Sequence, residues 1–135
     1  MKVDKKLEYT LIVLNHILSS NEDKLHTAKE LSRTYSLAFD SVSRVMQRMA
    51  SNGFLISEQG PSGGYKVIKD IEKRTLLELI NAISKKTVEI AKCIGGDCDK
   101  KEVCNIITPI ESLNNRLREF YQDISIGELL SLKGV

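Results

Sequence analysis

Apolar residues recur along most of the chain with the three- and four-residue spacing of helices. The first such stretch, residues 5–19, carries Leu7, Leu11, Leu14 and Leu18 on one face, and this wide stripe predicts a largely buried helix. Two short runs rich in apolar residues, 54–57 and 65–68, predict strands instead. Further helical periods cover residues 28–34, 38–51, 75–85, 109–122 and 126–132.

Four of these helices begin with the pattern of a capping box. In that pattern a Ser or Thr precedes a Glu by three residues, and each side chain satisfies a backbone N–H that has no partner within the helix. Pro109 stands at the expected first helical position, where its missing N–H costs nothing. The four pairs are Thr27 with Glu30, Thr75 with Glu78, Thr108 with Glu111, and Ser125 with Glu128.

The helices predicted over 28–34 and 38–51 are joined by a tight turn at 35–37, and Gly53 follows the second one as a left-handed stop. In the second helix, Val42, Val45, Met46 and Met49 share one face, which we expect to be buried. Polar residues occupy the opposite side. This arrangement is typical of a helix-turn-helix, although similar helix pairs occur in proteins that do not bind DNA.

The two predicted strands flank a turn-rich tip, Gly60-Pro61-Ser62-Gly63-Gly64. A hairpin directly after a recognition-type helix predicts a winged helix, whereas the simpler interpretation is an ordinary hairpin loop. The expected fold is therefore mainly α with a small β-hairpin wing. We predict base contacts from Asp40, Ser43, Arg44 and Gln47, a phosphate contact from Arg48, and wing contacts from Gln59, Ser62 and Lys66.

Composition and charge change this picture only slightly. The 135 residues suit one small domain with an added dimerising segment. The net charge of +2 is unevenly distributed, with ten basic and seven acidic residues in 1–69 against ten and eleven in 70–135. The basic half is suited to phosphate. No apolar run is long enough to cross a bilayer and no secretory pattern opens the chain, so we expect a cytoplasmic protein without membrane contact.

The three cysteines, Cys93, Cys98 and Cys104, lie together in a glycine-rich, charged segment. Grouped thiolates in such a segment favour a soft metal or an iron–sulfur cluster. One alternative is a disulfide with one spare thiol, which a reducing compartment disfavours. The other is a zinc site, which the four- and five-residue spacings between the cysteines disfavour. No phosphate-binding loop, nucleophile motif or paired His and carboxylate is present, so we do not expect an enzyme.

Several motifs along the chain together resemble the Rrf-two-type winged-helix regulators, the bacterial family that includes the IscR, NsrR and RirA repressors. The resemblance extends over nearly the whole length. It rests on Leu7-Glu8-Tyr9, the helix-turn at 27–37, Asn52-Gly53-Phe54-Leu55, the wing at 60–65, residues 75–80, the three cysteines, and Ile124-Ser125-Ile126-Gly127-Glu128-Leu129.

This resemblance implies a homodimer that binds a pseudo-palindromic double-stranded DNA operator. It also implies a 2Fe–2S or 4Fe–4S cluster held by Cys93, Cys98 and Cys104, whose presence or oxidation state changes DNA affinity. The corresponding division of the chain is a DNA-binding domain at 1–85, a cluster-binding loop at 86–106, and a dimerisation helix with a closing short helix at 107–135.

The chain departs from the family pattern at two places. The IscR-like branch has a His shortly after the third cysteine, but here that region is Asn105-Ile106-Ile107. By resemblance to the nitric-oxide-sensing branch, Glu8 of the partner subunit is the expected fourth ligand, and the alternative role for Glu8 is a first-turn carboxylate that favours the helix dipole. His16 is expected on a helix face rather than as a ligand. Gln59 replaces the Arg that the family often places before the wing Gly-Pro.

The function expected from these observations is that of a homodimeric DNA-binding transcriptional regulator, of repressor type, that senses redox state, nitric oxide or iron–sulfur and iron status through a cysteine-ligated cluster.

 Two alternatives remain open at this stage. One is a cluster-free regulator of the same fold that uses thiol oxidation or zinc. The other is a small iron–sulfur electron carrier, for which a helix-turn-helix and a wing have no evident use.

Overall fold

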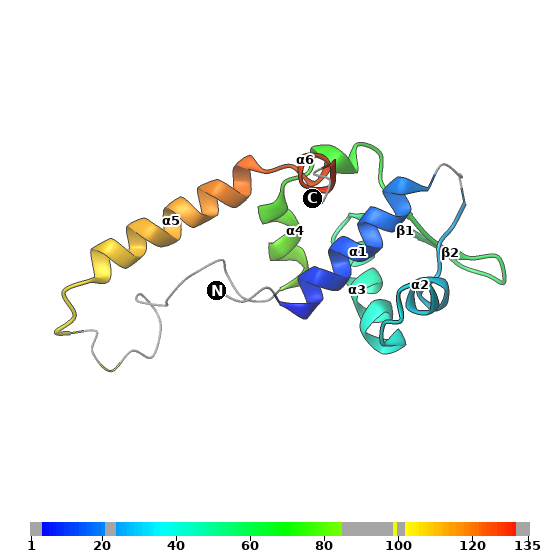
Figure 1. The fold of residues 1–135 in the computed structure, drawn as a ribbon, viewed down its shortest axis with the longest axis horizontal. Helices are drawn as coiled ribbons and strands as arrows, with labels where there is room; N and C mark the ends of the chain where they lie inside the picture. Colours follow the sequence, from blue (N-terminus) through cyan, green and yellow to red (C-terminus); the bar gives the residue numbers. More distant parts are fainter. Residues whose placement is uncertain (1–3, 21–23, 85–98, 100–101, 132–135) are drawn as a thin grey trace.

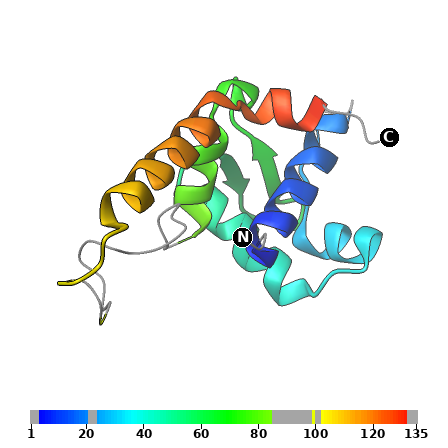
Figure 2. The same ribbon diagram turned by 60° about the vertical axis from the view of Figure 1, so that its left-hand side comes forward.

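The computed structural model describes residues 4–20, 24–84, 99 and 102–131, which form a mainly helical fold with one two-stranded hairpin. Helix α5 extends from the rest of the molecule as an arm (Figure 1). In the turned view the hairpin lies beside α1, and α6 returns from the arm across the winged part (Figure 2). The elements are α1 (Lys5–Ser19), α2 (Ala28–Tyr35), α3 (Phe39–Ser51), β1 (Leu55–Glu58), β2 (Gly64–Val67), the 3₁₀ turn η1 (Ile71–Lys73), α4 (Leu76–Ile83), α5 (Ile107–Asp123) and α6 (Ile126–Ser131).

The core forms where α1 packs against α3. The predicted inward face of α3 is buried, which confirms the periodicity argument for that helix. In α1 the buried line instead runs through Thr10, Val13, Leu14 and Ile17, and the other leucines of the predicted stripe are only half-buried. Leu31 from α2 and Leu79 from α4 close the same cluster. The buried apolar residues of the two central helices are Val13, Leu14, Ile17, Val42, Val45, Met46 and Met49.

Helix α3 ends in the left-handed stop that the sequence predicts. Gly53 has φ +79°, and the two backbone hydrogen bonds of a Schellman motif are present, from Phe54 to Met49 (2.8 Å) and from Gly53 to Ala50 (3.3 Å). Phe54 is buried directly after this turn. The turn therefore directs the chain from the recognition-type helix into β1 while it places an aromatic ring in the core.

Three of the four predicted helix caps are confirmed. The hydroxyls of Thr27, Thr75 and Ser125 each accept a hydrogen bond of 3.1 Å from the backbone N–H three residues on. The fourth is wrong, because α5 begins at Ile107, before Thr108, and its N-cap residue provides no side-chain bond. Pro109 is compatible with this earlier start, since the first turn of a helix leaves its N–H groups without intrahelical partners in either case.

The hairpin is tied to the residue that precedes α2. β1 and β2 pair antiparallel, and Tyr65 of β2 also exchanges two backbone hydrogen bonds of 2.8 Å with His26. A side chain at Gly64 would bring its Cβ to 2.8 Å from the His26 carbonyl oxygen, so only glycine permits this approach. The orientation of the wing is thus fixed relative to the helix-turn-helix.

The C-terminal elements return to the winged part through a second backbone bridge. Thr75 and Ser125, the N-caps of α4 and α6, lie side by side and their neighbours exchange hydrogen bonds of 2.8 Å, from Leu76 to Ile124 and from Ile126 to Arg74. Ile126 is fully buried. Within the described ranges, no helix combines the length and apolarity needed to span a bilayer.

Replacing Gly53 by Ala tests the turn after α3. No atom lies within 4 Å of the added Cβ position, so the cost comes from the left-handed backbone alone. We expect the free energy of unfolding to fall by about 1–2 kcal/mol, measured by urea titration. Ser51→Ala, an exposed change in the same helix, is the control and should stay within about 0.5 kcal/mol of the parent. An unchanged urea midpoint for Gly53→Ala would contradict the role given to the turn.

Candidate nucleic-acid interface

The outward face of α3 carries the four residues predicted to contact bases. Asp40, Arg44 and Gln47 are exposed and Ser43 is half-buried, opposite the face that packs on α1. The Gln47 amide donates a hydrogen bond of 3.2 Å to the Ser43 hydroxyl, which holds both groups on the same line of the helix. Amide, hydroxyl, guanidinium and carboxylate groups on one exposed helix face provide the donors and acceptors that base edges require.

Phe39 is a residue of this face that the sequence argument missed. Its side chain is 52% exposed in the first turn of α3, one turn before Ser43 and two turns before Gln47. An exposed aromatic ring beside polar groups on the same helix face is suited to contact the methyl group of thymine. The sequence contained a sign of this position, because Phe39 precedes Ser43 and Gln47 by four and eight residues and so shares their face. Apolar residues on a helix more often belong to the core, however.

Arg48, predicted to contact phosphate, lies at the edge of this face. Its guanidinium donates a 2.8 Å hydrogen bond to the Ile83 carbonyl at the end of α4, and the side chain is half-buried. It also lines, with Lys5, Lys6 and Arg44, a surface depression of about 610 Å³ between the start of α1 and α3. The sequence did not predict Lys5 and Lys6 as phosphate contacts, because they belong to α1 and lie near α3 only after the two helices have packed. The four cations together suit a phosphate backbone.

The wing presents its predicted residues at and beside the tip. Gln59 and Ser62 are exposed, and the Lys66 ammonium lies 3.2 Å from the Glu58 carboxylate across the hairpin. Both partners of this pair are about half exposed, at 43% and 50%. An exposed ion pair contributes little stability, so a DNA phosphate can replace Glu58 as the partner of Lys66 at small cost.

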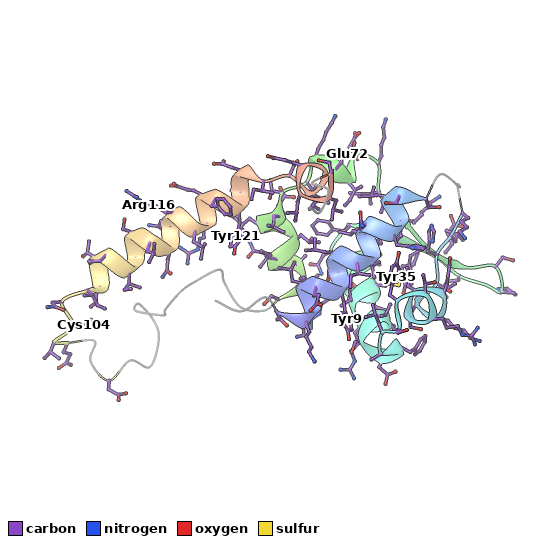
Figure 3. All side chains as sticks on the ribbon, viewed as in Figure 1. Tyr9, Tyr35, Glu72, Cys104, Arg116 and Tyr121 are labelled. Carbon is purple, nitrogen blue, oxygen red and sulfur yellow. The ribbon has the colours of Figure 1, made fainter. Side chains whose placement is uncertain are left out.

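The predicted cluster ligands are only partly described by the structure. Cys93 and Cys98 lie outside the described residues. Cys104 is a free, half-buried thiol shortly before α5. Figure 3 places Cys104 at the far end of the α5 arm, well away from Tyr9, the neighbour of Glu8 in α1. Glu8 is exposed in the first turn of α1. One chain therefore does not bring Glu8 and Cys104 together.

Comparison with known proteins identifies the family to which this chain belongs. The model of Rrf2, described as an iron-dependent transcriptional regulator, matches residues 3–131. The chain belongs to the Rrf2 family. It is accordingly a winged-helix, DNA-binding transcriptional regulator and not an enzyme. Among curated relatives, the regulator IscR of Cronobacter sakazakii is 25% identical over 132 residues, which cover 97% of this chain and 81% of that protein.

Solved structures show the same fold. A transcriptional regulator from Listeria innocua superposes with a TM-score of 0.76 at 18% identity, covering 100% of this chain and 90% of that one. CymR, the global cysteine regulator of B. subtilis, gives 0.73 at 15% identity over 99% of both chains. These likenesses confirm the winged-helix fold and the C-terminal helix that follows it.

Substitutions of Arg44 and Lys66 test whether base contacts and phosphate contacts are made by different residues of this Rrf2 protein. We expect Arg44→Ala to cost about 1–3 kcal/mol on the preferred site and to relax sequence preference, because a guanidinium that contacts guanine discriminates between bases. We expect Lys66→Ala to weaken all duplexes uniformly and to lower the salt slope of binding by about 1. Fluorescence anisotropy on duplexes selected in vitro, over a range of salt concentrations, measures both. Equal weakening of every sequence by Arg44→Ala would reassign it to phosphate.

Proposed function

We propose that this Rrf2 protein is a homodimeric regulator that senses redox state, nitric oxide or iron–sulfur and iron status through a cysteine-ligated iron–sulfur cluster. The observation that carries the proposal is that three cysteines precede α5 in the sequence, with Cys104 a free thiol at the far end of the arm (Figure 3). The description of the family model as iron-dependent and the likeness to IscR support it. Membership of a regulator family also favours it over an electron carrier.

The donor set fits such a cluster. Cys93, Cys98 and Cys104 would provide the thiolates, and Glu8 of the partner subunit the fourth ligand. Cys104 forms no disulfide and Glu8 is exposed, so both side chains are accessible to a group shared between subunits. Their separation within one chain (Figure 3) is compatible with ligation across a dimer. When bound, an iron–sulfur cluster supplies a redox-active and nitric-oxide-reactive centre.

The dimer is proposed to form along α5. Apolar side chains follow this helix at alternating spacings of four and three residues, which is the spacing of a coiled-coil seam. Three of them, Ile106, Leu113 and Phe120, are 51%, 46% and 59% exposed, and the chain itself covers them poorly. The full stripe comprises Ile106, Ile110, Leu113, Leu117 and Phe120. A second copy of the helix would bury it.

We assign to each segment of the chain the function that the sequence predicts. Residues 1–85 would contact DNA, 86–106 would bind the cluster, and 107–135 would dimerise. Because 86–106 joins α4 to the dimer helix, metal ligation within this segment would change how the two winged parts are spaced. Two recognition helices fit successive major grooves only when they lie about 34 Å apart. Sensing would therefore act through the geometry of the dimer.

A cluster-free regulator is the second candidate. The free thiol of Cys104 favours it, since a thiol that forms no disulfide is able to respond to oxidation or to bind zinc. Iron and sulfide content of anaerobically purified protein distinguishes the candidates, because only the cluster-binding protein contains both elements in stoichiometric amounts.

Anaerobic reconstitution tests the ligands and the switch together. We expect wild-type protein to take up iron and sulfide and to change its operator affinity at one fixed salt concentration relative to the apo form. Cys104→Ser should abolish uptake, and Glu8→Ala should alter the visible spectrum and hasten cluster loss. Glu72→Gln, an exposed carboxylate change elsewhere, is the control. Equal operator affinity of the loaded, oxidised and apo forms would refute sensing through the cluster, and an unchanged Glu8→Ala spectrum would refute that ligand.

Phe120→Asp tests the dimer seam. A charge in an apolar stripe that the dimer would bury is costly to desolvate, so we expect the sedimentation coefficient to shift from dimer to monomer. Asn115→Asp adds the same charge at an exposed position on another face of α5 and should leave the dimer intact. A Phe120→Asp protein that still sediments as a dimer would place the interface elsewhere.

A further inference from the structure

Two histidines and a glutamate converge where the end of α1 meets the start of α2. His16 comes from the last turn of α1, His26 from the segment before α2, and Glu30 from the first turn of α2. Their ligand atoms all lie within 4.8 Å of one another. His16 Nε2 is 3.9 Å from one Glu30 carboxylate oxygen, and His26 Nδ1 is 3.8 Å from the other.

These separations are close to those of a tetrahedral metal site. A zinc ion with bonds of about 2.1 Å holds its ligand atoms about 3.4 Å apart. The two His–Glu distances, which end on different Glu30 oxygens, exceed this value by about half an ångström, and the three ligand atoms lie up to 4.8 Å apart. Side-chain rotations would therefore have to draw the ligands together around an ion. Two imidazoles and one carboxylate are also a ligand set that zinc and similar divalent ions use, with water in the remaining position.

The surroundings of the three side chains suit ligation. The Tyr35 hydroxyl lies 2.7 Å from His16 Nδ1, and the tautomer that donates Nδ1–H to it leaves the Nε2 lone pair facing Glu30. Burial raises the pKa of Glu30, but Lys24, His26 and the Thr27 cap lower it by more, so the net pKa lies below its usual value. Glu30 is therefore a carboxylate at neutral pH.

The cluster is open on one side. A depression of about 480 Å³ adjoins it, lined by His16, Glu30, Tyr35 and small polar residues of α1. Lys24, whose ammonium lies 3.3 Å from Glu30, is 46% exposed and can turn into solvent when a cation replaces it. His26, by contrast, is 1% exposed and held by the backbone bridge to Tyr65. An ion and a water ligand thus have access to a partly preformed site.

We propose that His16, His26 and Glu30 bind a divalent transition-metal ion of the zinc class, independently of the cysteines. The site would join three parts of the DNA-binding unit. His16 belongs to α1, Glu30 opens the first helix of the helix-turn-helix, and the His26 backbone pairs with β2 of the wing. A bound ion would stabilise the relative positions of all three, which are the parts that must meet DNA together.

Cobalt titration of the full-length chain with Cys93, Cys98 and Cys104 all changed to Ser tests the site. Co²⁺ reports four-coordinate binding by its visible absorption, and the absence of thiols removes the competing ligands. We expect saturation at one Co²⁺ per chain, displacement by Zn²⁺, and a zinc-dependent rise in the thermal unfolding midpoint. His16→Gln and Glu30→Gln in the same background should each weaken Co²⁺ binding at least about tenfold.

A control variant and a folding measurement distinguish loss of the metal site from loss of the fold. Glu119→Gln, an exposed carboxylate change on α5, should bind Co²⁺ like the parent. Circular dichroism without metal shows whether the His16→Gln and Glu30→Gln proteins remain folded, and both sites are partly exposed, so we expect that they do. Absence of four-coordinate Co²⁺ absorption in the parent, or equal Co²⁺ affinity in the parent and both folded variants, would overturn the proposal.

Discussion

The packing of α3 on α1 determines what this protein can present to DNA. Burial of Val42, Met46 and Met49 against α1 leaves a single face of α3 directed outward. Because a helix has a fixed rotation per residue, burying one stripe orients every polar side chain on the opposite one. The polar residues available to contact bases are therefore selected by the apolar residues between them, and a change in the buried stripe would reorient this face.

The wing depends on a different constraint, which is backbone pairing. A two-stranded hairpin has little stability alone, and this one gains a third short partner where His26 pairs with Tyr65. Gly64 makes the pairing possible because any side chain there would collide with the His26 carbonyl. The helix-turn-helix and the wing are thus joined at the residue whose imidazole also faces Glu30 (3.8 Å). The orientation of the wing and the geometry of the His16, His26 and Glu30 cluster consequently both depend on the backbone pairing of His26 with Tyr65.

Local rules account for most of what the sequence could predict. Apolar spacing and hydroxyl caps act within one or two turns, so α1, α2 and the end of α3 fall within a residue of their predicted bounds. The start of α5 was misplaced because Pro109 fits either position in the first turn. The meeting of His16 with Glu30, and of Lys5 with Arg44, depends on the packing of separate helices, which periodicity does not encode. Phe39 was missed because outer and inner apolar residues look alike in a sequence.

The α5 arm has a fixed end and a distant end, and this arrangement limits how a signal can travel. Its C-terminal end is tied to α4 through the bridge between Thr75 and Ser125, whereas Cys104 lies beyond its N-terminal end (Figure 3). The 17 residues of the helix span about 26 Å between these points. A chemical change near Cys104 is too far from its own winged part to act by contact. In the proposed dimer it would act along the helix, through the segment 86–106 that joins α4 to α5, or on the winged part of the second subunit, and the exposed apolar residues of the arm favour the last of these routes.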